Sequence, residues 1–265
     1  MGPTGYTGCI KELIERKSVR VFTGEKIPPE QKAWILEAAV NAPTAGCQQL
    51  YTIIDVTDEK LKAKLSVTCD NQPFIAKAEL VLVFCADCRK WYEGFLDTGC
   101  DPRPPGEGDL LLAVTDAAIA AQNAVTAAWS LGIGSCYIGD VMENCEEQQR
   151  LLKLPACVFP AVMVVFGYPV KQQMEREKPK RAEMKYIVSE NGYPDQTAED
   201  RAEMFFESRE LSATTKKEGS TAASPEYQAW MQAFCKRKYN SDFSREMTRS
   251  VREYLKDYSG KEGIL

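Results

Sequence analysis

The segment from Asp109 to Trp129 constrains the fold more than any other part of the chain. Its sequence, DLLLAVTDAAIAAQNAVTAAW, is rich in alanine and leucine, nearly free of charge, and carries polar residues only at intervals. A helix that is apolar on most of its sides has to be buried. The sequence therefore predicts a helix that runs through the centre of a domain or lies in a subunit interface.

Strand and helix patterns alternate around this segment. Runs rich in apolar and β-branched residues predict strands at 52–56, 79–87 and 161–169, and a short strand after Gly132. Helical spacing of apolar residues predicts helices at 10–16, 29–43, 58–66 and 143–154. A long loop is expected after the strand at 79–87, with 99–108 as its most irregular part. The alternation indicates an α/β or α+β domain that ends near Pro169.

The rest of the chain has a different composition. Residues 171–188 are highly charged, and a Gly/Ser/Thr-rich gap separates the first two of three predicted helices at 198–211, 225–239 and 242–258. These helices are too few to hold a convincing core of their own. We therefore expect a main domain of residues 1–190 and a C-terminal helical extension of residues 191–265, which packs on the core or on a partner subunit.

The composition excludes several classes of function. The net charge of −5 gives no reason to expect nucleic acid or an anionic membrane as a partner. The chain contains no run of eighteen apolar residues and no signal-peptide pattern at its N-terminus, so a cytoplasmic protein is expected. Its ten cysteines are scattered, which favours free thiols in a reducing compartment over a disulfide framework.

The chain has no histidine. This absence excludes Ser-His-Asp and Cys-His triads, and it excludes metal sites that depend on histidine. Any catalysis must use carboxylates, lysine, tyrosine, cysteine or a cofactor. A bound cofactor becomes the favoured source of chemistry.

Two apparent binding motifs are excluded by their spacing or by the residues around them. In LGIGSCYIG, the glycines at 132, 134 and 139 have the wrong spacing for a dinucleotide fingerprint, and they follow a helix instead of a strand. Cys85 and Cys88 form a single CxxC without the second pair that a zinc or iron–sulfur site requires. We therefore expect no Rossmann loop and no bound metal.

The basic stretch Arg16-Lys17-Ser18-Val19-Arg20 allows two interpretations. Two guanidinium groups and a hydroxyl could converge on one oxyanion such as a phosphate. The same residues would also suit a solvated basic turn at the C-terminus of a helix, where cations are favoured. The stretch alone does not decide between a ligand site and a solvated turn.

Four short motifs, taken in order, resemble the FMN-dependent nitroreductase family. They are the basic stretch at 16–20, PTAGCQQ at 43–49, Asn71-Gln72 before a buried strand, and GIGSCYIG at 132–139 after the buried helix. The resemblance covers roughly residues 10–190, and the tail looks like the C-terminal extension of some longer members. It implies an α+β fold with a mixed sheet flanked by helices, and an intertwined homodimer with one FMN in each of two interface pockets.

The resemblance also implies roles for single residues. Arg16 and Ser18 would bind the FMN phosphate, and Arg20 would reach the pyrimidine side of the isoalloxazine ring. A cation there favours the anionic reduced flavin. Lys180 and Arg181 resemble the basic pair that completes the phosphate site. Lys17 has no counterpart and is expected to be solvated.

Further flavin contacts are implied in the other motifs. Thr44 and Gln49 match residues of the family's loop, whereas Cys47 stands where an asparagine is usual and cannot replace an amide that both donates and accepts. Asn71 resembles the amide at the pyrimidine edge. Ile138 and Gly139 end the short strand, and the backbone N–H of Gly139 would lie near flavin N5.

The implied reaction is ping-pong and flavin-based, without a catalytic side chain. NADH or NADPH would deliver a hydride to flavin N5, and a nitroaromatic, quinone or flavin would then take the electrons in the same pocket. The segment from Trp91 to Gly108 and the tail are candidate pocket walls. Alternatives are reductive dehalogenation or flavin-destroying chemistry on the same fold, a flavin-binding protein without turnover, and an interaction protein that acts through its helical tail.

Overall fold

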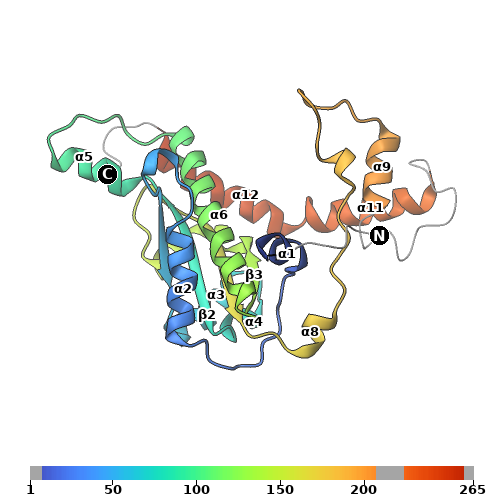
Figure 1. The fold of residues 1–265 in the computed structure, drawn as a ribbon. Coiled ribbons are helices and arrows are strands. Elements are labelled where there is room, and N and C mark those ends of the chain that lie inside the picture. The colour runs from blue at the N-terminus through green and yellow to red at the C-terminus, as the bar shows by residue number, and fades with distance from the viewer. Residues whose placement is uncertain (1–7, 207–223, 260–265) are drawn as a thin grey trace. The chain divides into compact units, whose positions relative to one another are not determined.

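The computed structural model describes residues 8–206 and 224–259 (Figure 1). These residues form two compact units, one of 8–176 together with 246–259 and the other of 177–245. The boundary predicted at residue 190 falls inside the second unit. The last part of the tail, from Glu246, belongs to the first.

Within the described residues, the first unit contains a four-stranded sheet. Its order is β1 (Tyr51–Asp55), β2 (Leu80–Asp87), β4 (Val158–Gly167), β3 (Gly134–Ile138), and each neighbouring pair runs antiparallel. The predicted α+β class is confirmed. The sheet is antiparallel, however, where a mixed one was expected, and a parallel pairing occurs only as an isolated bridge between Ser18 and Ser135 among the residues described.

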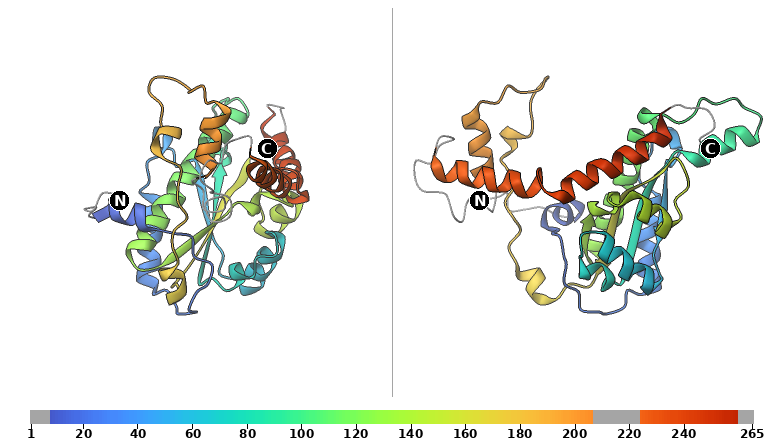
Figure 2. Two further views of the ribbon diagram at one scale, coloured as in Figure 1. Left: turned by 90° about the vertical axis from the view of Figure 1, so that its right-hand side faces the viewer. Right: turned by 180° about the vertical axis from the view of Figure 1, so that it is seen from behind.

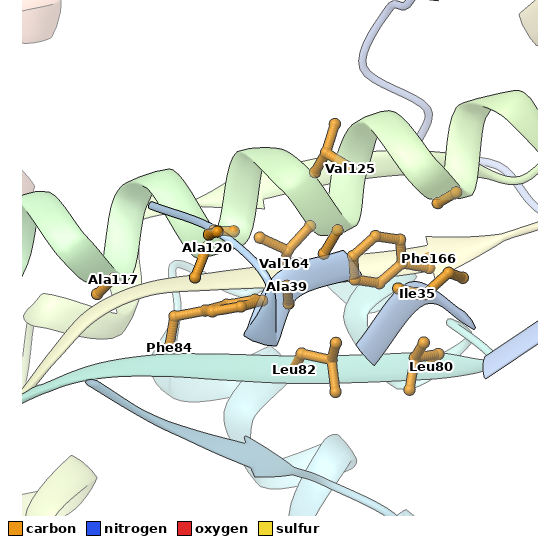
Figure 3. Packing of buried hydrophobic residues seen from close by; sticks show 14 of the residues in the cluster. Ile35, Ala39, Leu80, Leu82, Phe84, Ala117, Ala120, Val125, Val164 and Phe166 are labelled. Carbon is orange, nitrogen blue, oxygen red and sulfur yellow. The ribbon is translucent and has the colours of Figure 1, made fainter. Parts of the chain in front are cut away.

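Helices α2 (Pro29–Val40) and α6 (Glu107–Ser130) cover one face of the sheet (Figures 1 and 3). The buried side of α6 is a row of alanines, which lets the helix approach the sheet closely while Phe84 and Phe166 fill the space between them. The helix predicted at 109–129 is confirmed, and one side of it is buried against the sheet. By length and apolarity α6 would also be able to cross a membrane, but nine of its residues are buried in this fold.

The opposite face of the sheet is covered by α3 (Glu59–Thr68), α4 (Pro73–Ala76) and α7 (Cys145–Leu152) (Figure 2). Helix α3 begins at Asp58, whose carboxylate accepts a hydrogen bond from the backbone N–H of Lys60 at 2.8 Å. Strand β2 is buried along its whole length because helices cover both of its faces.

Two elements differ from the sequence predictions. Helix α5 (Arg89–Asp97) forms where a loop was expected, since Asp87 accepts hydrogen bonds from the first backbone N–H groups of the helix. Strand β4 begins at Val158, earlier than predicted, and includes Pro160. A break in the β2–β4 register between Phe84 and Cys85 accommodates that proline.

The remaining helices lie toward the two ends of the chain. Helix α1 spans Gly8–Glu15 and α8 spans Lys171–Glu175. In the second unit, α9 (Ala198–Phe206) and α11 (Pro225–Lys238) bury Ala202 and Tyr227 in a small cluster. Most of the gap predicted between the first two tail helices lies outside the described residues. Helix α12 spans Asp242–Leu255.

The end of α12 packs inside the first unit. Tyr254 is buried and meets the ring of Phe159 edge-on, with ring centroids 5.0 Å apart. Tyr258, in the turn after the helix, is also buried, beside Cys157. These contacts anchor the chain end on the main sheet.

Candidate functional site

The segment from Ser18 to Phe22 packs closely against the sheet because two sheet residues next to it are glycines without side chains. A Cβ atom on Gly134 would lie 2.6 Å from Cγ2 of Val19, and one on Gly167 would lie 2.8 Å from the ring of Phe22. Any side chain at either position would push the segment away. The backbone N–H of Val19 donates to the carbonyl of Ser135 at 2.8 Å, which fixes the register.

The side chains of Arg16, Ser18 and Arg20 converge around Cys136 of β3. Burial raises the pKa of the Cys136 thiol, while the charge of Arg20, hydrogen bonding with Arg20 and Ser18, and the charge of Arg16 lower it. The charge of Arg16 also acts on Tyr137, the next residue of β3. The structure brings together the three residues that the sequence assigned to FMN.

Within residues 8–206 and 224–259, this cluster has no counterion from the protein. Among the described residues, neither Arg16 nor Arg20 forms an ion pair, and the buried Nε of Arg16 has no hydrogen-bond partner. A buried, unpartnered guanidinium N–H is costly unless an acceptor from outside the chain satisfies it. The donor set fits a phosphate group.

Lys17 has a structural role, in contrast to its expected solvation. Its ammonium donates to the carbonyl groups of Met174 and Arg176 at 2.6 and 2.7 Å. Arg176 donates in return to the carbonyl of Ser18 at 2.8 Å. These bonds tie the chain after α8 to the basic stretch.

Asp116 holds the loop that carries Thr44, Cys47 and Gln49 by hydrogen bonds. The sequence analysis did not identify this residue. Asp116 is 2% exposed in the middle of α6, and its carboxylate accepts hydrogen bonds from the hydroxyl of Thr44 (2.5 Å) and from the backbone N–H groups of Ala45 (3.1 Å) and Leu50 (3.2 Å). The available signal was an acidic residue at a central position of an otherwise apolar helix.

Three residues of this loop have left-handed backbone. Gly46, Cys47 and Gln49 have φ values of 55°, 56° and 50°. An asparagine tolerates this conformation better than a cysteine does. The asparagine expected at position 47 would therefore relieve backbone strain, and the exposed Cys47 carries it instead.

Asn71 and Gly139 lie in two turns that are bonded to each other. Gln72 donates from Nε2 to the carboxylate of Asp140 at 2.8 Å, so the residues next to Asn71 and Gly139 are joined directly. Asn71 is exposed, with a φ of 50°, and Ile138 is 1% exposed. Sequence reasoning did not identify Gln72 and Asp140 as the link.

Gly139 is not required by the packing of its own chain. A Cβ there would meet only the Cε of Met142 at 3.8 Å, an ordinary contact, and the φ of Gly139 is not left-handed. A glycine that neither packing nor backbone conformation demands suits a position where a ligand approaches the main chain closely.

Within one chain, the predicted contacts form two separate groups. Arg16, Ser18 and Arg20 lie at the β3 edge of the sheet, whereas the loop with Thr44 and Gln49 leads into β1 at the opposite edge. Three interstrand spacings amount to about 14 Å. Lys180 and Arg181 belong to the second unit, before the short turn Met184–Tyr186, and their role stays a prediction.

Comparison with known proteins identifies the family of this chain. A sequence model of the nitroreductase family matches residues 13–168, more than half of the chain. The chain belongs to the nitroreductase family. The family predicted from the four motifs is thus confirmed.

Named relatives of this nitroreductase-family chain are reductases. An FMN reductase (NAD(P)H) of Bacillus subtilis is 35% identical over 171 residues, 64% of this chain and 69% of that protein. An oxygen-insensitive NADPH nitroreductase of Salmonella typhimurium is 34% identical over 193 residues, 73% of this chain and 75% of that protein. The structure of NfrA1 nitroreductase from B. subtilis matches with a TM-score of 0.78 at 27% identity, covering 95% of this chain and 98% of that one.

Proposed function

We propose that this member of the nitroreductase family binds FMN and transfers electrons from NADH or NADPH to a nitroaromatic, quinone or flavin acceptor. Relatives named as an FMN reductase and an NADPH nitroreductase support the cofactor and the electron donor. FMN, when bound, accepts the hydride and passes the electrons on. Its chemistry needs no protein nucleophile, in agreement with a chain that has no histidine.

The observation that carries the proposal is the unpaired basic cluster at the β3 edge. Arg16 and Ser18 would hold the phosphate, since the buried Nε of Arg16 lacks a partner among the described residues. Arg20 would place its charge at the pyrimidine side of the ring, where it favours the reduced anion. Asn71 and the backbone of Gly139 would contact the ring from the two joined turns.

The proposal includes a homodimer. Thr44, Cys47 and Gln49 lie at the sheet edge opposite the basic cluster, so the corresponding loop of a second copy is the better source of those contacts. Helix α1 has no buried residue and exposes Ile10, Leu13 and Ile14, and α6 exposes Leu111 and Leu112. Apolar side chains on helix surfaces favour an interface with another subunit.

A cavity beside the loop at 44–49, which the proposed homodimer would bring to the flavin site of the second copy, suits a small acceptor. Its volume is about 300 Å³, and its wall includes Gln48, Trp91, Phe95, Pro102 and Arg103. Trp91 is fixed by a hydrogen bond of 2.7 Å from its indole N–H to the carbonyl of Gln48. The aromatic wall favours stacking with a planar quinone or nitroaromatic ring.

We also place the protein in the cytoplasm. All ten of its cysteines lie in the described residues and are free thiols. A chain with this many unpaired thiols suits a reducing compartment.

The test compares FMN with riboflavin, which lacks the phosphate, by fluorescence titration of wild type and Arg16→Gln. We expect the substitution to weaken FMN binding by about tenfold or more and to leave riboflavin binding unchanged, because it removes a charged phosphate contact. Lys11→Gln, an exposed charge change on α1, is the matched control. Equal loss of both ligands, or loss of neither, would contradict the assignment of Arg16 to the phosphate.

A further inference from the structure

Glu143 is a buried acid next to the proposed flavin contacts. It is only 4% exposed, and its buried Oε1 has no hydrogen-bond partner among the described residues. A buried carboxylate with an unpartnered oxygen is strongly disfavoured, whereas the neutral acid is tolerated. The surroundings of Glu143 therefore stabilise its protonated form relative to the carboxylate.

Asp140 and Glu143 belong to one turn, in which the backbone N–H of Glu143 donates to the carbonyl of Asp140 at 3.1 Å, and a hydrogen bond between their side chains is among the causes that raise the pKa of Glu143. Two carboxyl groups form such a bond only when one of them carries a proton. The same Asp140 accepts a hydrogen bond from Gln72 at 2.8 Å and directly follows Gly139. The carboxyl pair thus belongs to the turn of Gly139, where Gln72 joins that turn to the turn of Asn71.

The other charges around Glu143 have the same sign or are already paired. Asp70 lies at the end of α3, and Glu246 of α12 is bonded to Arg249, which also binds Glu146 of α7. Burial, followed by the charges of Asp140 and Asp70, raises the pKa of Glu143 to about 8. The neighbouring thiol of Cys69, with its pKa raised to about 12 by burial, stays neutral. Despite these acids, no group of side chains within 8–206 and 224–259 has the geometry of a metal site.

We propose that Glu143 and Asp140 share one proton and that this pair supplies the proton taken up when the acceptor is reduced. The proposal rests on the function proposed above, because it needs a proton-consuming acceptor bound beside Gly139. It adds a general acid to a site that otherwise depends on the cofactor.

The balance of the reaction requires such a donor. A quinone gains two electrons and two protons on its way to a hydroquinone, and the hydride from NADH or NADPH, passed on through the cofactor, accounts for two electrons and one proton. The second proton must come from a protein acid or from water. Histidine, the usual donor near neutral pH, is absent from this chain. Glu143 would lose its proton through Asp140 and regain it from solvent.

The first experiment is an infrared pH titration of the purified protein without added cofactor. We expect the C=O band of a protonated carboxyl at pH 7 that disappears as the pH rises through about 8. Glu143→Gln should remove the band, and Asp140→Asn should move its midpoint to lower pH. Glu147→Gln, an exposed acid on α7 paired with Arg150, should leave it unchanged. A wild type without the band, or a band that survives in Glu143→Gln, would overturn the shared proton.

The second experiment compares two acceptors in the flavin-loaded protein. Glu143→Gln should lower kcat with a quinone about tenfold or more, without raising KM, and should leave turnover of ferricyanide, which takes up no proton, within twofold of wild type. Glutamine has the shape and neutrality of the protonated acid, so the fold should be preserved. An equal effect on both acceptors, or no effect on either, would overturn the donor role.

These tests separate the two proposals. A wild type that shows the infrared band but reduces neither acceptor would refute the proposed reductase function, and with it the donor role, while the shared proton would stand. A wild type that reduces both acceptors but lacks the band would refute the donor proposal alone.

Discussion

The two groups of predicted flavin contacts are positioned by different physical means. The segment with Arg16, Ser18 and Arg20 is fixed by close packing, because Gly134 and Gly167 leave room for no other side chain. The loop with Thr44 and Gln49 is fixed by one buried carboxylate, that of Asp116, and contains left-handed backbone. The first group depends on volume, and the second depends on hydrogen bonds.

This difference predicts how each group responds to substitution. A packed segment tolerates the loss of a polar atom but not an added methyl group. A loop on a buried acceptor tolerates changes of volume at its surface but not the loss of the acceptor. Four substitutions test this contrast, and they are given in order of decreasing effect.

Asp116→Ala should have the largest effect. It leaves two backbone N–H groups and one hydroxyl without their acceptor, at a cost of about 3–5 kcal/mol in the free energy of unfolding. Urea denaturation measures the loss, with the exposed Asp97→Ala as the control that should change stability by less than about 0.5 kcal/mol. A loss as small as that of the control would mean that the loop does not depend on Asp116.

Gly134→Ala tests the packed segment. The new methyl group would lie within 3.0 Å of three atoms of Val19, so we expect a loss of about 2–3 kcal/mol and weaker FMN binding. Adding Val19→Ala, which removes two of those atoms, should recover part of the loss in a double-mutant cycle.

Gly94→Ala is the matched control for that substitution. Gly94 lies inside α5, and a Cβ atom added to it would have no neighbour within 4 Å, so alanine should be neutral or stabilising there. If Gly134→Ala behaved like Gly94→Ala, close packing would not explain how the basic segment is held.

Glu143→Gln extends the contrast to a buried acid that lies in neither group. The pKa of Glu143 is raised to about 8 in the folded protein, so folding keeps a proton that the unfolded chain has lost. Wild-type stability should therefore fall as the pH rises from the unfolded pKa toward about 8. Glu143→Gln should remove this decline, so its stability relative to wild type should increase between pH 5 and pH 8. Parallel pH profiles of the two proteins would refute the raised pKa.

Cys47→Asn should have the smallest effect. Asparagine fits the left-handed φ of 56° better than cysteine, so stability should rise by about 0.5–1 kcal/mol. The midpoint of urea denaturation measures the gain. A lower midpoint would show that the backbone at Cys47 is not strained.

The sequence predicted the elements that have strong local patterns. The alanine-rich helix α6, strand β2 and helix α3 all follow from apolar spacing and turn residues. Each of these signals lies within a few residues of the chain.

What the sequence could not reveal depends on contacts between distant segments. In the sequence, Asp116 is one polar residue in an apolar helix. Its role becomes clear only from the structure, in which the loop at 44–50 donates hydrogen bonds to it. In the sequence, Glu143 resembles an ordinary surface acid. In the structure it is buried, and the charges of Asp140, Asp70 and Glu246 of the tail raise its pKa. Helix α5 starts because Asp87, at the end of a strand, caps it. These roles depend on contacts that form only when the chain folds.

The most direct test of the account is the visible absorption spectrum of the purified protein under anaerobic conditions, before and after NADH or NADPH is added. The account predicts flavin bands, present as purified or after FMN is supplied, that bleach when the reduced nicotinamide is added. A colourless protein that takes up no FMN, or flavin bands that neither nicotinamide bleaches, would contradict it.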